Sequence, residues 1–201
     1  LGLTLLLSLA AIAVNRAADD DGIFTYEVTG STVSITGCVD VCPTELVIPE
    51  SYNGSAVTKI GLAAFSRKGL VSVSIPNGVT EIGEWAFRTN KLTKIALPKN
   101  LETLGDYAFG NNEISEIEWP DSINTISPGA FTQNKLTEIT IPNGVTQIGN
   151  RSFSSNELRI LDLPDSVTTI EDWAFSGNDL FEVVIPENVV EIGVSPFNQN
   201  H

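Results

Sequence analysis

The feature that most constrains the fold of this chain is a phenylalanine that recurs every 22 residues. Prolines and asparagines recur with the same period, so three residue types keep one spacing. A fixed period of this length is typical of repeat proteins, in which each repeat is one structural unit. The phenylalanines are Phe65, Phe87, Phe109, Phe131, Phe153, Phe175 and Phe197.

One complete unit, residues 136–157, reads LTEITIPNGVTQIGNRSFSSNE. Ile139 and Ile141 alternate with polar residues, which is the period of a half-buried strand. Pro142 has no N–H for a strand ladder and is expected to start a turn. Gly149 is expected to let the chain bend. One such unit cannot bury its own apolar side, so the sequence predicts a mainly β repeat solenoid with parallel strands and about seven coils.

The two ends of the chain differ from the middle. The segments 24–28 and 32–36 alternate like strands around Thr29-Gly30-Ser31, which predicts a β-hairpin that caps the first coil. Residues 1–14 are almost wholly apolar but too few to span a membrane, for which about 20 are needed, so residues 1–18 are predicted to be a truncated signal peptide. We expect a leader and capping hairpin over 19–43 and a C-terminally truncated solenoid over 44–201.

Two cysteines, Cys38 and Cys42, are close in the sequence. In an exported protein such a pair favours a disulfide. The alternative is a zinc site, which usually needs four ligands, whereas His201 at the far end is the only histidine. We therefore expect a disulfide and no metal site.

The unit pattern LxxIxIPxxVxxIGxxAFxxNxL resembles the BspA-type leucine-rich repeat, also called the Treponema-pallidum-type class. The resemblance covers residues 22–201 and implies a leucine-rich repeat that is secreted or displayed on the cell surface. Several members are adhesins, which implies adhesion to other proteins. Because the family motif is structural, no binding residue carries over from it.

The family usually has cysteine in the column that holds asparagine here. An asparagine at a turn commonly bonds nearby backbone, so we expect the column to satisfy backbone groups of adjacent coils. The alternative is a row of ligand-binding amides. The column contains Asn90, Asn112, Asn134, Asn156 and Asn178.

Composition argues against several functions. The formal net charge of -14 disfavours nucleic acid, which is bound through Lys and Arg. There is no usable histidine, no free thiol beside a disulfide and no phosphate-binding loop, so we expect no catalysis, no cofactor and no small-molecule substrate.

Binding is better supported than catalysis. Alternation places Lys94 and five acidic residues on the outer face of the predicted sheet. Such a face fits a basic partner or Ca²⁺, or it serves solubility alone. Trp85 and Tyr107 share a column just before Ala-Phe and either bind a glycan or anchor a protein, or pack on the neighbouring turn. The five acidic residues are Glu116, Glu118, Glu138, Asp162 and Glu182.

The leading hypothesis is a secreted or cell-surface module that binds a protein on another cell or in the matrix through its sheet face. The alternatives are a spacer that displays a downstream domain, and a glycan-binding module that uses the aromatic column.

Overall fold

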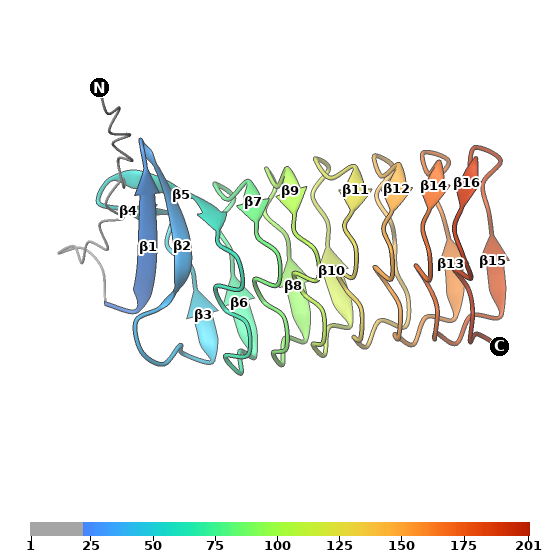
Figure 1. Cartoon of the computed structure of the whole chain (residues 1–201), viewed down its shortest axis with the longest axis horizontal. Coiled ribbons are helices and arrows are strands. Elements are labelled where there is room, and N and C mark those ends of the chain that lie inside the picture. Colours follow the sequence, from blue (N-terminus) through green and yellow to red (C-terminus); the bar gives the residue numbers. More distant parts are fainter. Residues whose placement is uncertain (1–21) are drawn as a thin grey trace, which may run out of the picture.

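The computed structural model describes residues 22–201, so the predicted signal peptide and the start of the leader lie outside the described residues. Figure 1 shows an elongated stack of coils with the N- and C-terminal ends of the stack at opposite ends. It is the predicted β-solenoid, with about seven turns spaced about 22 residues apart. Residues 22–201 contain no helix, and hence none that could cross a membrane.

The first coil is covered by the predicted hairpin. Strand β1 (Phe24–Thr29) pairs antiparallel with β2 (Thr32–Cys38), and β2 pairs parallel with β5 (Ser55–Ile60) of the first coil. The ring of Phe24 packs edge-on against Phe65, with 6.1 Å between ring centroids. The hairpin therefore hides the end of the core. The predicted disulfide is also confirmed, since Cys38 at the end of β2 is bonded to Cys42.

Three-residue strands form one side of the solenoid, which we call the first ladder. They pair parallel in twos, β3 with β6, β8 with β10, and β13 with β15, each pair one coil apart. Their central residues face inward and their outer two face solvent. The strands are β3 (Glu45–Val47), β6 (Ser72–Ser74), β8 (Lys94–Ala96), β10 (Glu116–Glu118), β13 (Ile160–Asp162) and β15 (Glu182–Val184).

A second ladder of two-residue strands runs along another side, where the sequence indicated apolar positions but no strand. It pairs parallel in the orders β5-β7-β9 and β11-β12-β14-β16, and the insertion in the first coil forms β4 (Ser51–Tyr52), antiparallel to β5. The strands are β7 (Glu81–Ile82), β9 (Thr103–Leu104), β11 (Thr125–Ile126), β12 (Gln147–Ile148), β14 (Thr169–Ile170) and β16 (Glu191–Ile192).

The segment around Ala-Phe forms the remaining side as a turn. Its N–H groups bond the next coil, as from Phe87 N to Ala108 O at 2.8 Å. The residue two before each phenylalanine has a positive φ, for example 57° at Trp85. The glycines just before this turn have ordinary φ, so bending freedom is not their role. A Cβ at Gly105 would lie 2.3 Å from Glu84 N, which shows that they allow close approach of neighbouring coils.

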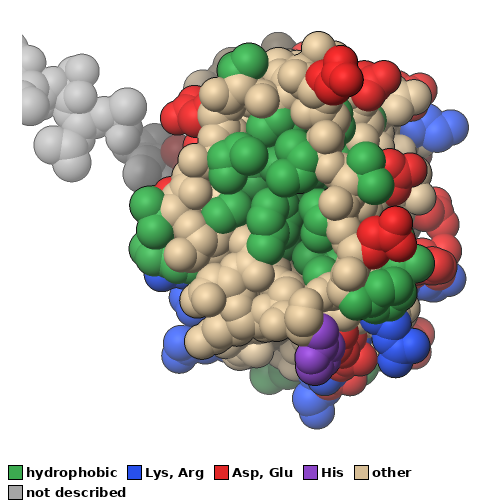
Figure 2. Space-filling view, turned by 90° about the vertical axis from the view of Figure 1, so that its right-hand side faces the viewer, with side chains coloured by type: hydrophobic (Ala, Val, Ile, Leu, Met, Phe, Trp, Pro, Cys, Tyr) green, Lys and Arg blue, Asp and Glu red, His purple; other side chains and the backbone are tan. Residues whose placement is uncertain are grey.

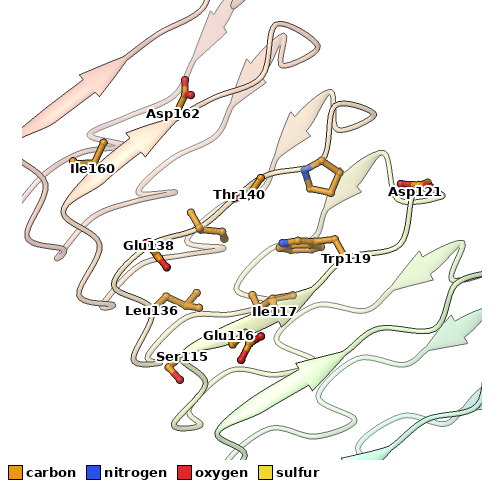
Figure 3. Close-up of a pocket in the computed structure, with 12 residues that line it drawn as sticks. Ser115, Glu116, Ile117, Trp119, Asp121, Leu136, Glu138, Thr140, Ile160 and Asp162 are labelled. Atoms are coloured by element: carbon orange, nitrogen blue, oxygen red, sulfur yellow. The ribbon is translucent and has the colours of Figure 1, made fainter.

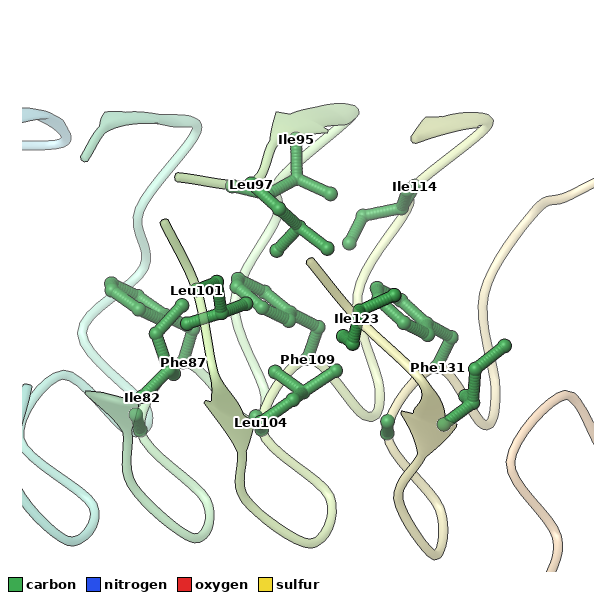
Figure 4. Packing of buried hydrophobic residues seen from close by; sticks show 14 of the residues in the cluster. Ile82, Phe87, Ile95, Leu97, Leu101, Leu104, Phe109, Ile114, Ile123 and Phe131 are labelled. Carbon is green, nitrogen blue, oxygen red and sulfur yellow. The ribbon is translucent and has the colours of Figure 1, made fainter. Parts of the chain in front are cut away.

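The core is a stack of phenylalanine rings that runs the length of the solenoid. Neighbouring rings from Phe65 to Phe197 are stacked at centroid distances from 5.1 to 5.9 Å. Leucine and isoleucine side chains from both ladders pack around them (Figure 4). Because each ring contacts the next, the coils depend on their neighbours for burial.

At the C-terminal end of the stack, apolar side chains of the last coil face outward. Figure 2 shows them as an apolar centre surrounded by polar and acidic groups. Ile192 and Val194, equivalent to largely buried or turn positions elsewhere, are more than half exposed here.

Candidate functional site

The acidic residues predicted to face outward are all exposed, on the side of the solenoid that carries the first ladder. They belong to two columns, not one. Glu116, Glu138 and Glu182 share a column with Lys94 and the apolar Ile160, whereas Glu118 and Asp162 share a column with Ala96 and Val184. The acidic charge is therefore concentrated on the central coils.

The first ladder is interrupted at these central coils. The alternation at Ile139 and Ile141 predicts a strand in this coil, but the structure forms none over 138–141, so that prediction is wrong. Strand β10 pairs only with β8, and β13 only with β15. Among the described residues, no backbone hydrogen bond joins 138–140 to the coil on either side.

β6 and β8 are likewise not paired with each other, with Ile75 in the column between them, but only the gap after β10 contains a tryptophan, Trp119. It stands in the column that holds Leu97, Ile141 and Leu163 in other coils. Its indole reaches Phe131 and Phe153 edge-on, with centroid distances of 5.3 and 6.5 Å.

The spacing of the ring stack does not set this place apart. The distance between Phe131 and Phe153 is 5.9 Å, and Phe175 and Phe197 are 5.8 Å apart without a tryptophan beside them. The indole is larger than the leucine or isoleucine of the other coils, and its contacts with both rings place it between the two coils on this side.

The separation leaves a cleft of about 710 Å³ on the sheet face. Figure 3 shows the indole of Trp119 lying across the opening between β10 and the segment that carries Glu138 and Thr140. Ile117 and Ile139 are half-buried here, as are the equivalent Val73 and Val183, whereas Ile95 and Leu161 are buried. The cleft thus has an apolar floor.

The rim of the cleft is negatively charged. Its lining includes the carboxylates Glu116, Asp121, Glu138 and Asp162 and no Lys or Arg. The ion pairs within residues 22–201 join other residues, such as Lys59 with Glu81 and Lys135 with Glu157. None of the four carboxylates is in one of these ion pairs, although Lys94 stands opposite Glu116 in the pairing of β8 with β10, so the rim has a net negative charge that favours a cation.

The carboxylates do not converge on a chelating site. Among the residues that the structure describes, no group of three or more His, Cys, Asp or Glu side chains is placed to hold a metal ion.

Partial burial raises the pKa of Asp106, away from the cleft, and the negative charge of Glu171 raises it further.

The aromatic column lies at the turn, away from the first ladder. The ring of Tyr107 is half-buried, with Arg88 5.7 Å from its centroid, and it covers Gly129, where a Cβ would lie 2.2 Å from the ring. The indole of Trp173 likewise lies under Arg151 at 4.3 Å. Trp85 is the most exposed of the three aromatic residues, at 39%. Tyr107 and Trp173 are thus engaged by their own molecule.

The asparagine column is buried and bonds backbone. Asn134 Nδ2 donates to Phe109 O and Phe131 O, and its Oδ1 accepts from Ile114 N, all within 3.1 Å. The same pattern recurs at the other members of the column, for example Asn112 and Asn156. The amide groups of this column are therefore hydrogen-bonded to backbone inside the turn, and they present no row of amides to a ligand.

Sequence reasoning placed three of the cleft's carboxylates on the sheet face but missed the cleft itself. It treated Trp119 as one more core residue of its column and gave no role to Asp121 or Ile160. The available signal was the single tryptophan in a column otherwise filled by leucine and isoleucine.

This architecture, with short parallel strands and inward leucine and isoleucine positions that recur from coil to coil, defines a leucine-rich repeat solenoid. The family model of the BspA type leucine rich repeat region matches residues 58–179 and 102–201, with 6 copies. The chain belongs to the BspA-type leucine-rich repeat family. A search of curated proteins finds no match.

Solved structures of bacterial leucine-rich proteins are similar. A leucine rich cell surface protein from Faecalibacterium prausnitzii is 28% identical, with a TM-score of 0.66 over 92% of this chain. The chain spans 52% of that protein's length. The Treponema pallidum leucine rich repeat protein is 22% identical, with a TM-score of 0.57 over 88% of this chain and 86% of that one. The pneumococcal vaccine antigen PcpA is 17% identical, with a TM-score of 0.52 over 92% and 80%.

Proposed function

We propose that this chain is a secreted or cell-surface module that binds a protein partner through the acidic outer face of its first ladder. The observation that carries the proposal is the set of carboxylates on the central coils, which take part in none of the ion pairs among the described residues. Repulsion between them disfavours the unbound state and favours a partner with basic groups. The similarity to a bacterial cell-surface protein supports the location.

The test compares two variants with the same change in net charge. The face variant replaces Glu116, Glu118, Glu138 and Asp162 by Ser. The control variant replaces four exposed acidic residues elsewhere, namely Glu102, Glu113, Asp165 and Glu187, by Ser.

Both variants and the parent are applied to an array of extracellular and matrix proteins at low and high salt. We expect the face variant alone to lose partners that the parent binds, and parent binding to weaken with salt because exposed charges are screened. Equal losses in both variants would mean that net charge, and not this face, determines binding.

A spacer role is the second candidate, and the position of the two ends favours it. The ends of the stack lie at opposite ends of a rod, which suits separation of a domain from a surface (Figure 1). A spacer has no partner of its own, so an array on which the parent protein binds nothing would favour this function over adhesion.

Glycan binding through Trp85 and Tyr107 is the third candidate, and the exposure of Trp85 is the observation that favours it. A glycan array should then show sugars that the parent binds and a Trp85→Ala variant does not. An array that is blank for the parent protein would remove this candidate.

A further inference from the structure

We infer that the cleft beside Trp119 is the specificity pocket of the acidic face and takes an arginine side chain from an exposed segment of the partner protein. The inference rests on the proposed function, since it concerns the same face. It adds the chemical group that is recognised and a residue, Trp119, that no acidic pattern indicates.

The shape of the cleft matches a side chain with an apolar stem and a charged end. The floor is formed by Ile117 and Ile139, with Trp119 beside them, and the carboxylates stand at the rim. A long cationic side chain buries its methylene groups on apolar surface while its charge stays near polar groups. A purely apolar side chain would leave the rim carboxylates without a partner, and a purely polar one would leave the floor uncovered.

The chemistry of the walls favours arginine over lysine. A guanidinium is planar, stacks on an indole, and can bond two carboxylate oxygens at once. It is also more weakly hydrated than an ammonium group, so it enters an apolar cleft at lower cost. Here the indole of Trp119 and the carboxylates of Glu116 and Glu138 line the same opening.

Trp119 has two roles in this inference, as a wall of the pocket and as the cause of its existence. The strands β8 and β13, which precede Leu97 and Leu163 in this column, each pair with the next coil, whereas β10 before Trp119 and β6 before Ile75 do not. A Trp119→Leu variant should therefore close the cleft and pair 138–140 with β10, without removing any carboxylate. Amide hydrogen exchange at 138–140 should then slow in this variant.

The binding test uses a synthetic peptide, acetyl-Gly-Ser-Arg-Ser-Arg-Ser-Gly-amide, titrated into the protein and followed by NMR. The Trp119 indole N–H and the amides of 116–118 are the reporters. Matched peptides carry citrulline, which keeps the shape and loses the charge, or lysine, which keeps the charge and loses the planar group. We expect affinity in the order arginine, lysine, citrulline, with shifts confined to the cleft.

Variants separate the contributions. The pair Glu116→Gln with Glu138→Gln should weaken binding of the arginine peptide about tenfold or more, the size expected for loss of a charged hydrogen-bonding partner. Trp119→Leu should weaken it by about tenfold through loss of the indole face and closure of the cleft. The matched pair Glu102→Gln with Glu113→Gln should leave it unchanged.

Three results would overturn the inference. They are equal affinity for the arginine and citrulline peptides, equal affinity for the arginine and lysine peptides, and a Trp119→Leu variant that closes the cleft yet binds as before. Trp119→Leu could keep both the peptide and the array partners while the four-residue Ser variant loses them. That result would refute the arginine pocket and leave the proposed binding by the acidic face supported. If the Ser variant keeps its array partners, the proposed function itself fails.

Discussion

Replacing Asn134 by Ala should test how the asparagine column holds two coils together. Most acceptors of its amide have a second donor. Phe109 O also accepts from Asn112 Nδ2, and Phe131 O also accepts from Asn156 Nδ2. The N–H of Ile114 is different, since Asn134 Oδ1 at 3.0 Å is its acceptor and no other is recorded. The substitution should therefore orphan one buried N–H.

The expected magnitude follows from this accounting. An orphaned buried donor costs about 1–3 kcal/mol, and each shared bond that is lost costs a further 0.5–1.5 kcal/mol or so. We expect Asn134→Ala to lower the free energy of unfolding by about 3 kcal/mol. Asn124→Ala is the control, because Asn124 is exposed and its side chain accepts only from Thr125 Oγ1, so the change should alter stability by less than about 0.5 kcal/mol.

The assay is urea unfolding followed by circular dichroism, together with amide hydrogen exchange. Exchange gives the decisive local signal, because Ile114 should lose protection while Leu92, which bonds Asn112 Oδ1, should keep it. If Asn134→Ala and Asn124→Ala are equally stable, or if Ile114 and Leu92 stay equally protected, the reasoning about the column is refuted.

Three further substitutions give clear expectations. Ser152→Ala should raise the thermal midpoint and stabilise the fold by about 1 kcal/mol, because the Ser152 hydroxyl is buried without a hydrogen-bond partner; a lower midpoint would contradict this. Gly129→Ala should destabilise the fold by about 1–2 kcal/mol, since φ at this position is +62° and the new Cβ would meet the Tyr107 ring. In urea unfolding, adding Tyr107→Ala to the same chain should recover part of the lost stability. If nothing is recovered, the ring contact is not the cause. The pKa of Asp106 is raised on folding, so its ionised form opposes folding at neutral pH and this penalty disappears as pH falls through the folded pKa. Asp106→Asn should therefore be more stable than the parent at pH 7 and lose that advantage in acid, and an advantage that grows in acid would reverse the assigned sign.

The repeat made most of the fold predictable from the sequence. The phenylalanine period fixed the coil length and the inner stack, and the change of pattern before Thr44 indicated the capping hairpin. The close cysteine pair indicated the disulfide. These features depend on local pattern and on neighbours one period away, which is the information that a repeat sequence contains.

The second ladder and the cleft were not predictable in the same way. Two-residue strands such as β11 and β12 are too short to produce a sequence period. The segment Glu138-Ile139-Thr140 has the same alternation as Glu116-Ile117-Glu118, yet only the latter is a strand. The two segments differ in their neighbours, since Glu138-Ile139-Thr140 follows the coil that carries Trp119, so alternation within a segment does not by itself predict whether it pairs.

The same packing explains why the acidic pattern was only partly informative about the candidate site. Glu116, Glu138 and Asp162 line the cleft, whereas Glu118 and Glu182 stand on the same face outside it. Alternation along a strand predicts which side chains face solvent, but it does not predict where two coils separate.

The asparagine column also implies an order in which the coils fold. Each asparagine supplies hydrogen bonds to the backbone of the preceding coil. Asn90 Nδ2, for example, donates to Phe65 O, and Asn90 Oδ1 accepts from Leu70 N, which lies 20 residues earlier in the chain. During synthesis from the N-terminus, a coil that has just emerged therefore has an open turn until the next one arrives. Assembly should advance as a moving front that starts at the hairpin cap, with the newest coil always the least ordered. A chain that emerges in this order exposes one unfinished coil at a time, which limits the apolar surface available for aggregation.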